Sequence, residues 1–289
     1  MSDNKLFCYG CGYTAKYLAA MLLAENWSVS GTTRSPEKAA SLRETGISPV
    51  IWDDDLSQTA LEDATAILVS TAPTENGCPA LKAAETTIVE HKDTLRWIGY
   101  LSTNGVYGDY DGAWVNEQSP LRATSSRARR RIEAEKAWRN FADAHNIPLI
   151  IFRLPGIYGP GRSALDTVRA GKAKRLYKEG QVFSRAHVHD IAQALLASIK
   201  NPEAGDLFNI ADDEPAPPQD VISLACELLG VTPPPLIPIE EADISDMARS
   251  FYADNKRVNN KRMKEALGIT LTFPTYREGL STLHIAETR

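Results

Sequence analysis

The stretch KLFCYGCGYTAKYL, residues 5–18, decides the fold because it contains a strand, a glycine turn and a helix in direct succession. Residues 6–9 form an apolar run of strand length, and from Lys16 onward apolar residues recur at three- and four-residue steps. The turn between them is Gly10-Cys11-Gly12. This order places a helix N-terminus, with its free N–H groups and positive dipole end, directly after the turn, where a phosphate binds well.

The turn follows the pattern G-x-G-x-x-A, which is typical of dinucleotide binding. Gly10 permits the tight turn, Gly12 leaves room for a pyrophosphate, and Ala15 stands where a third glycine would let helix pack on strand. We therefore expect the pyrophosphate of a dinucleotide cofactor to bind here. The candidate residues are Gly10, Cys11, Gly12, Tyr13 and Thr14.

Length and composition suit one large α/β domain, or a nucleotide-binding domain with a smaller lobe, since the chain has 289 residues and 43% of them are apolar. The net charge of −5 argues against a general binder of nucleic acid or of membrane surfaces. No apolar run reaches the roughly 18 residues of a membrane span, and MSDNK lacks a signal-peptide core. We expect a cytoplasmic protein with no nucleic-acid or membrane partner.

The four cysteines are too few and too scattered for a disulfide framework in a chain of this length. Cys8 and Cys11 form a C-x-x-C, which is also a redox pattern. Because one lies in the expected strand and the other in the phosphate turn, we interpret them as parts of the cofactor site and keep redox chemistry as the weaker alternative. No second Cys or His pair stands at zinc-ligand spacing, so we expect no metal.

Strands and helices alternate along the rest of the chain, which indicates an α/β fold with a doubly wound parallel sheet. The expected strands are residues 28–33, 48–52, 66–70, 97–101, 148–152 and 181–188. The expected helices are residues 80–95, a long helix in 122–146 capped by Thr124, Ser125 or Ser126, 165–170, 190–199 with Asp190 as its cap, 219–229 and 260–267.

The end of the second strand predicts the choice of cofactor. In dinucleotide-binding sheets a carboxylate there accepts the 2′-hydroxyl of NAD, whereas a cation accepts the 2′-phosphate of NADP. Arg34, Ser35 and Lys38 stand at this position. They favour NADP over NAD, and the alternative is an arginine that is merely exposed in a loop.

With these elements placed, the chain resembles the extended short-chain dehydrogenases/reductases, of the NAD-dependent epimerase/dehydratase group. The motifs that carry the resemblance are LSTNGVYGD at 101–109, Glu117 with Pro120, FRLPGIYGPG at 152–161, FSRAHVHDIAQALLAS at 183–198, LFNIADDEP at 207–215 and NNKRMKEALG at 259–268. The resemblance implies a Rossmann-type sheet in residues 1–155, to which 181–205 return. It implies a small substrate-binding lobe built from 156–180 and 206–289.

The resemblance also assigns site residues. It implies that Asp55 and Leu56 lie near the adenine, that Thr71, Ala72 and Pro73 flank the ribose and pyrophosphate, and that Pro155 and Gly156 lie at the nicotinamide end. Thr103 falls where the group binds a substrate hydroxyl. Two features mark the chain as atypical. The glycine turn is tighter than the usual G-x-x-G-x-x-G, and Asn104-Gly105 replace the acidic pair of sugar dehydratases, so their β-elimination is not expected.

The catalytic Tyr-x-x-x-Lys pair of the family is replaced by Arg127 and Arg131 in the long helix. Arg131 could still hold the ribose, but Arg127 cannot act as acid or base near neutral pH because a guanidinium stays protonated there. A shifted register would pair Ser125 with Arg129. We also expect Glu133 and Glu135 to pair with the arginines four residues before them.

Other side chains could replace the missing tyrosine as the proton donor. The candidates are His187, His189, Tyr107 and Tyr158, which are more simply explained as structural residues. We therefore expect an NADP-binding oxidoreductase or epimerase acting on a small polar or anionic metabolite, with a homodimer left open. The alternative is a catalytically silent NADP(H)-binding sensor or scaffold protein.

Overall fold

The computed structural model describes residues 4–52, 61 and 63–288, and its centre is a seven-stranded sheet in the order β11-β7-β5-β4-β1-β2-β3. All of its strand pairs are parallel. The strands are β1 (Lys5–Tyr9), β2 (Ser28–Thr33), β3 (Ser48–Ile51), β4 (Ala66–Val69), β5 (Trp97–Thr103), β7 (Leu149–Leu154) and β11 (Leu207–Asn209). The strand order reverses between β1 and β4, which is where doubly wound sheets bind their ligands. The predicted fold class is confirmed.

Helices cover both faces of the sheet. One face carries α1 (Tyr13–Ala24), α2 (Pro36–Glu44) and α7 (Val188–Lys200), and the other carries α4 (Pro79–Glu90) and α5 (Ser126–His145). No helix in residues 4–52, 61 and 63–288 is long and apolar enough to cross a membrane.

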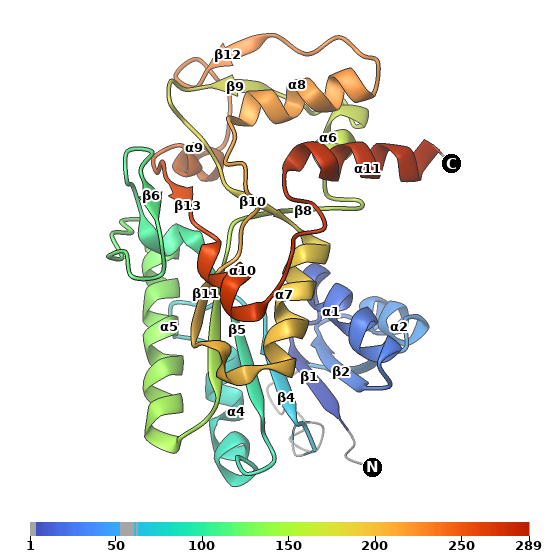
Figure 1. Ribbon diagram of the computed structural model, residues 1–289, viewed down its shortest axis with the longest axis vertical. Coiled ribbons are helices and arrows are strands. Elements are labelled where there is room, and N and C mark those ends of the chain that lie inside the picture. Colours follow the sequence, from blue (N-terminus) through green and yellow to red (C-terminus); the bar gives the residue numbers. More distant parts are fainter. Residues whose placement is uncertain (1–3, 53–60, 62, 289) are drawn as a thin grey trace.

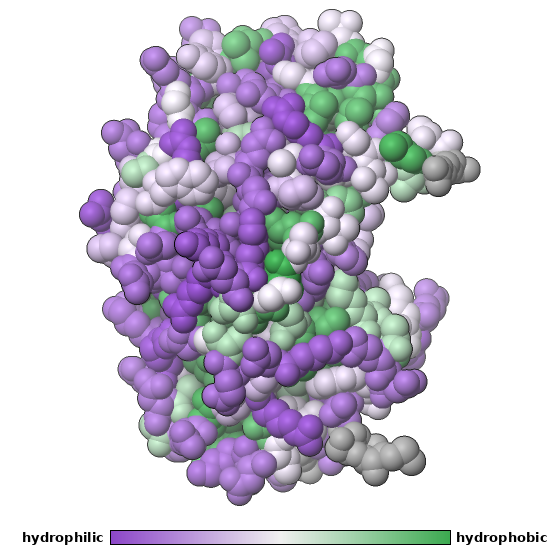
Figure 2. Space-filling view, viewed as in Figure 1, coloured by the Kyte–Doolittle hydropathy of each residue, from purple (hydrophilic) through white to green (hydrophobic). Residues whose placement is uncertain are grey.

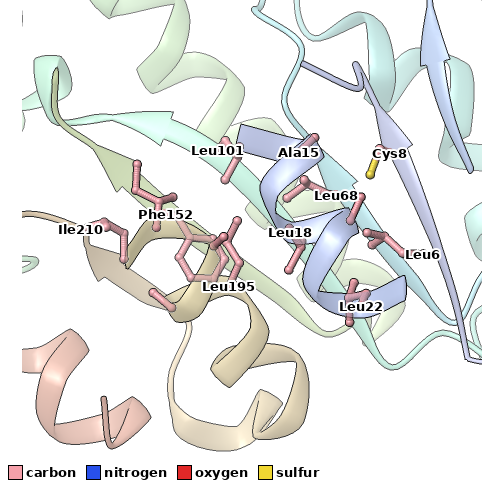
Figure 3. Packing of buried hydrophobic residues seen from close by; sticks show 14 of the residues in the cluster. Leu6, Cys8, Ala15, Leu18, Leu22, Leu68, Leu101, Phe152, Leu195 and Ile210 are labelled. Atoms are coloured by element: carbon pink, nitrogen blue, oxygen red, sulfur yellow. The ribbon is translucent and has the colours of Figure 1, made fainter. Parts of the chain in front are cut away.

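Alternation along β1 builds both halves of the core. Leu6 and Cys8 point to the α1 side, while Phe7 and Tyr9 point to the α4 side, and all four are buried. Figure 3 shows the first side, where Leu18 of α1 lies over this cluster. Burying one such leucine side chain contributes about 1.5–3 kcal/mol, so this helix is held mainly by its apolar face.

A second layer of elements lies beyond the carboxyl ends of the strands (Figure 1). We call it the lobe. It contains β8 (Gly156–Tyr158), α6 (Ala164–Arg169), β9 (Arg175–Tyr177), β10 (Arg185–His187), α8 (Pro218–Leu228), β12 (Leu236–Pro238), α9 (Asp246–Phe251) and α11 (Tyr276–Thr288). Its own small core includes Leu165, Ala225, Tyr276 and Leu280. The short elements are η1 (Asn104–Tyr107), β6 (Trp114–Val115), η2 (Pro202–Ala204), β13 (Arg257–Val258) and α10 (Lys261–Leu267).

The expected boundary of the lobe at residue 206 differs from the structure. β11 pairs with β7 as the edge strand of the sheet, and α10 packs against α7 and β11. These two elements therefore pack with the central sheet rather than with the lobe. The predicted strand at 181–188 is reduced to β10, which pairs with β8 outside the main sheet.

The predicted cap of α7 is wrong. His187 is the N-cap, and its Nδ1 accepts from the backbone N–H of His189 at 3.2 Å. Asp190 lies inside the first turn and accepts instead from the backbone N–H groups of Thr272, at 2.8 Å, and Phe273, at 3.0 Å. A distant loop therefore uses the carboxylate that the local pattern assigned to the helix.

Candidate cofactor and substrate site

The turn between β1 and α1 has the backbone shape that a pyrophosphate needs. Gly10 has φ +84°, and a Cβ there would lie 3.0 Å from the Thr71 methyl carbon. The turn is held to β2 by hydrogen bonds from Gly10 N to Thr32 Oγ1, at 2.7 Å, and from Cys11 N to Thr32 O, at 2.9 Å. Only glycine fits this left-handed and crowded position without strain.

Gly12, in contrast, faces open space. Apart from its two chain neighbours, no atom of the described residues lies within 4 Å of where its Cβ would be, and Gly12 is the N-cap of α1 without a side-chain cap from that part of the chain. The first turn of α1, which begins with Tyr13 and Thr14, thus presents its N–H groups to an accessible space. An open cradle at an uncapped helix end fits the diphosphate of a dinucleotide.

Thr71, two residues after the end of β4, lies beside this turn. Its hydroxyl is buried and has no hydrogen-bond partner among residues 4–52, 61 and 63–288. Ala72 is exposed and Pro73 partly buried after it. A buried hydroxyl without a partner costs free energy, which a ligand at this edge would offset.

At the end of β2, Arg34 is exposed and Ser35 caps α2 by accepting from Lys38 N at 3.2 Å. Glu37 also lies in the first turn of α2, where its own backbone N–H and the Ser35 hydroxyl lower the pKa of its carboxyl. This carboxylate is thus engaged with the helix N-terminus. Asp55 and Leu56, expected near the adenine, lie outside the described residues.

Arg131 is fixed at the end of β5. Its Nη1 donates to Leu101 O at 2.8 Å and to the Tyr100 hydroxyl at 3.1 Å. Thr103, the last residue of this strand, is partly buried, and its Oγ1 accepts from Gly105 N at 3.2 Å. Arg131 and Thr103 are therefore both anchored at the carboxyl end of β5.

Arg127 is placed differently. It is exposed, and its guanidinium lies 5.1 Å from the centre of the Phe251 ring, at the end of α9 in the lobe. In the shifted register, Ser125 accepts from Ala128 N at 3.3 Å as the N-cap, and Arg129 Nε donates to Thr124 O at 2.7 Å. Both side chains of that alternative pair are engaged with the helix end.

The expected pairing of arginines with glutamates four residues later is wrong. Glu133 forms its ion pair with Lys136, at 2.9 Å, and Glu135 with the buried Arg153, at 2.7 Å. Glu135 faces the sheet, where a partner from β7 replaces the one on its own helix.

A buried polar network, which sequence reasoning missed, supports the carboxyl end of β5. Glu135 accepts from Ser102 Oγ and from Nε and Nη2 of Arg153. Arg153 Nη1 also donates to the Tyr107 hydroxyl at 3.0 Å, and this hydroxyl donates to Asn209 Oδ1 at 2.7 Å. Burial disfavours the charge of Arg153, but Glu135 outweighs it and raises the pKa of the guanidinium.

The hydroxyl of Tyr107, one of the candidate proton donors, is engaged in this network. Tyr107 is fully buried, and its hydroxyl both accepts and donates a hydrogen bond. Burial raises the pKa of the Tyr158 phenol, which donates to Thr275 O at 3.3 Å. Burial also lowers the pKa of His187 to about 4, so this imidazole is neutral at physiological pH. The described residues contain no group of three or more His, Cys, Asp or Glu side chains that could hold a metal ion.

A cleft of about 620 Å³ lies in the lobe, between β8, α6, α8 and α11. Its lining includes four cationic side chains, Arg162, Lys172, Lys174 and Arg185. Asp166 also lines it, but this carboxylate accepts from Ser163 N and Oγ in the capping box of α6. Figure 2 shows the surface hollowed between the lobe and the part that carries α1 and α2.

The loop after β8, which contributes Arg162 to the cleft, contacts the turn before α1. The Tyr13 hydroxyl donates to Pro160 O at 3.0 Å, and the Arg162 guanidinium lies 5.6 Å from the centre of the Tyr13 ring. Gly156, which also lines the cleft, donates its N–H to Ser184 O at 3.3 Å, and Pro155 precedes it. A molecule in the cleft would therefore lie near the start of α1.

Comparisons with known proteins agree with the fold. A family model described as "NAD dependent epimerase/dehydratase family" matches residues 10–211. The solved structure of a functionally unknown conserved protein from Silicibacter pomeroyi is 45% identical, with a TM-score of 0.92 over 99% of this chain and 100% of the other. Protein YeeZ of Escherichia coli K12 is 28% identical over 290 residues, which cover 94% of this chain and 97% of YeeZ. A dTDP-glucose 4,6-dehydratase from Bacillus anthracis, solved with NAD, shares the fold at 18% identity and a TM-score of 0.76, covering 99% and 96% of the two chains.

Proposed function

Because the chain belongs to the NAD-dependent epimerase/dehydratase family, we propose that it binds NADP(H) at the turn before α1 and acts on a small anionic metabolite held in the lobe cleft. The reaction class is hydride transfer at a carbon that bears oxygen, as in an oxidoreductase or epimerase. When bound, the nicotinamide supplies or accepts the hydride.

The observation that carries the proposal is Arg162. It lines the cleft and also lies over Tyr13, the first residue of the uncapped helix α1. The Arg162 guanidinium therefore lies between the cleft, where we expect the substrate, and the turn before α1, where we expect the cofactor. Three further cations line the same cleft, which favours a carboxylate or phosphate on the substrate.

The preference for NADP(H) rests on the end of β2. Arg34 is exposed there, and the Ser35 and Lys38 backbone form the N-terminus of α2, so a 2′-phosphate would meet a cation and a helix dipole together. The nearby Glu37 carboxylate is held by the helix N-terminus and Ser35. A 2′-phosphate could take the place of the Glu37 carboxylate at the N-terminus of α2.

Within the active site, we assign Thr103 to the reacting oxygen of the substrate and Arg131 to the nicotinamide ribose. Arg127 would orient the anionic group of the substrate rather than move a proton, since a guanidinium stays protonated near neutral pH. General acid catalysis contributes about 10²–10⁴-fold, so turnover of simple carbonyl compounds should be slow unless the substrate provides its own acid.

A second candidate function, an NADP(H) sensor without catalysis, is favoured by one observation. Arg127, which the resemblance aligns with the catalytic tyrosine of the family, has its guanidinium 5.1 Å from the centre of the Phe251 ring at the end of α9. It would then connect the cofactor site with this helix of the lobe. In a sensor, cofactor binding would be kept while turnover is absent.

Three measurements test the proposal. Thermal shift with NADPH and NADH reads cofactor choice, because a ligand at about 100 times its Kd stabilises the native state by about 2.7 kcal/mol. NADPH oxidation is then followed with carbonyl compounds that carry a carboxylate or phosphate, each beside an uncharged analogue. Arg162→Ala should abolish the advantage of the charged compounds.

Arg169→Ala is the matched control, because this arginine lies on α6 and pairs with Glu287 away from the cleft. Equal stabilisation by NADH would contradict the cofactor preference. Binding of NADPH without oxidation of any compound would favour the sensor.

A further inference from the structure

The C-x-x-C of the phosphate-binding turn brings two thiols together. Cys8 pairs with Gly31 across β1 and β2. A Cβ on Gly31 would lie 2.9 Å from the Cys11 Cβ, 3.1 Å from the Cys8 Cβ and 3.3 Å from the Cys11 Sγ. The two cysteine Cβ atoms are therefore at most about 6 Å apart. A disulfide requires a Cβ separation of about 3.5–4.5 Å, which a small movement of the turn can reach.

The environment makes the two thiols unequal. Cys8 is fully buried, whereas Cys11 is partly exposed and directly precedes the N-cap of α1. The interaction between the neighbouring thiols raises the pKa of Cys8 and lowers that of Cys11. The Lys16 charge also lowers the pKa of Cys11, although burial opposes it. Cys11 is thus placed to react first and Cys8 to resolve the product.

Gly31 is what makes this arrangement fit. Any side chain at this position of β2 would occupy the space beside both cysteines. The other two cysteines have different surroundings. Cys78 is buried and accepts from Trp138 Nε1 at 3.3 Å, and Cys226 is fully buried in α8. Both are expected to be inert, because buried thiols in apolar surroundings rarely ionise.

We propose that Cys8 and Cys11 are a reversible oxidation site that reacts with hydroperoxides. The Cys11 thiolate attacks the peroxide, the O–O bond breaks, and a sulfenic acid forms while the alcohol or water leaves. The Cys8 sulfur then attacks the sulfenic sulfur, forming the S–S bond and releasing water. A dithiol restores both thiols by exchange.

The second part of the proposal rests on the proposed cofactor site. A dinucleotide on the turn would cover Cys11, so the cofactor should protect the pair from oxidation. At an NADPH concentration about 100 times its Kd, about one molecule in 100 is free, and oxidation should slow by about 100-fold.

Peptide mass spectrometry tests the site directly, because trypsin cleavage after Lys5 and Lys16 releases residues 6–16 with both cysteines and no other. After treatment of the full-length protein with hydrogen peroxide, this peptide should lack two hydrogens and resist alkylation, and dithiothreitol should reverse the change. Cys8→Ser should stop at a sulfenic acid that dimedone traps at Cys11. Cys11→Ser should leave Cys8 reduced.

Two results would overturn the proposal. One is a peptide that stays fully alkylatable under conditions in which peroxide oxidises free dithiothreitol. The other is oxidation of Cys78 and Cys226 at the same rate as the pair. If the disulfide forms and NADPH binds by titration without slowing it, the oxidation site stands and the proposed position of the cofactor is wrong.

Discussion

Glu135→Gln is the perturbation for which the structure gives the clearest magnitude. Glu135 and Arg153 are both 6% exposed at the side chain and lie 2.7 Å apart, and Glu135 also accepts from Ser102. Replacing the carboxylate leaves the Arg153 charge buried without its counter-ion. Breaking a buried pair from one side costs about 3–5 kcal/mol. For a chain of this size, we expect the melting temperature to fall by roughly 6–15 °C.

The matched control is Glu133→Gln, two residues earlier on the same helix. Its partner Lys136 is 62% exposed and Glu133 itself 70%, so this pair contributes at most about 1 kcal/mol. Urea unfolding followed by circular dichroism measures both variants. The double variant Glu135→Leu with Arg153→Met should recover much of the loss, because it removes the unpaired charge as well. Equal, small losses for the two single variants would refute the reasoning.

Three further predictions concern the cofactor, the core and pH. Arg34→Ala should weaken NADPH binding about tenfold or more and leave NADH binding nearly unchanged, as read by fluorescence titration. Arg43→Ala, at the other end of the helix α2 that follows Arg34, is the control, and equal losses for both cofactors would count against a 2′-phosphate site. Leu18→Ala should cost about 2–5 kcal/mol in urea unfolding, because this side chain of α1 is fully buried against the sheet; a loss under about 1 kcal/mol would mean that other contacts hold the helix. Burial raises the pKa of Asp212 to about 8, above its value in the unfolded chain, so the native state loses stability as pH rises toward 8. The free energy of unfolding of Asp212→Asn should therefore gain on that of the wild type by up to about 4 kcal/mol between about pH 5 and pH 8. A difference between the two proteins that stays constant with pH would contradict the raised pKa.

Local signals predicted the elements around the glycine turn and the start of α5. The succession of β1, turn and α1 and the N-terminus of α5 depend on neighbours within a few residues, and Ser125 is among the three predicted caps. The polar network under β5 could not be predicted in this way. Its hydrogen bonds join residues 18 to 102 positions apart, such as Arg153 with Glu135 and Tyr107 with Asn209.

Tertiary contacts also explain the errors. On α5, spacing alone paired Glu135 with Arg131, but burial against β7 gives it Arg153. Asp190 looked like a helix cap and instead holds the loop before α11. In both cases a carboxylate found a distant partner that no local pattern contains. The candidate residues of the glycine turn, residues 10–14, share one local motif, whereas the cleft in the lobe draws on α6, α8 and α11 and emerged only from the structure.

The position of β11 has a consequence for how the chain can be divided. This strand completes the sheet beside β7, yet β8, α6 and β9 of the lobe come between them in the sequence. A single cut after residue 155 would remove β11 and also α7, and Phe152, now fully buried, would lose its neighbours Phe208 and Leu195. Neither half is a contiguous piece of polypeptide. During synthesis on the ribosome the sheet can be completed only after residue 209 has emerged. The lobe segments that precede β11 are therefore synthesised before the sheet has its last strand.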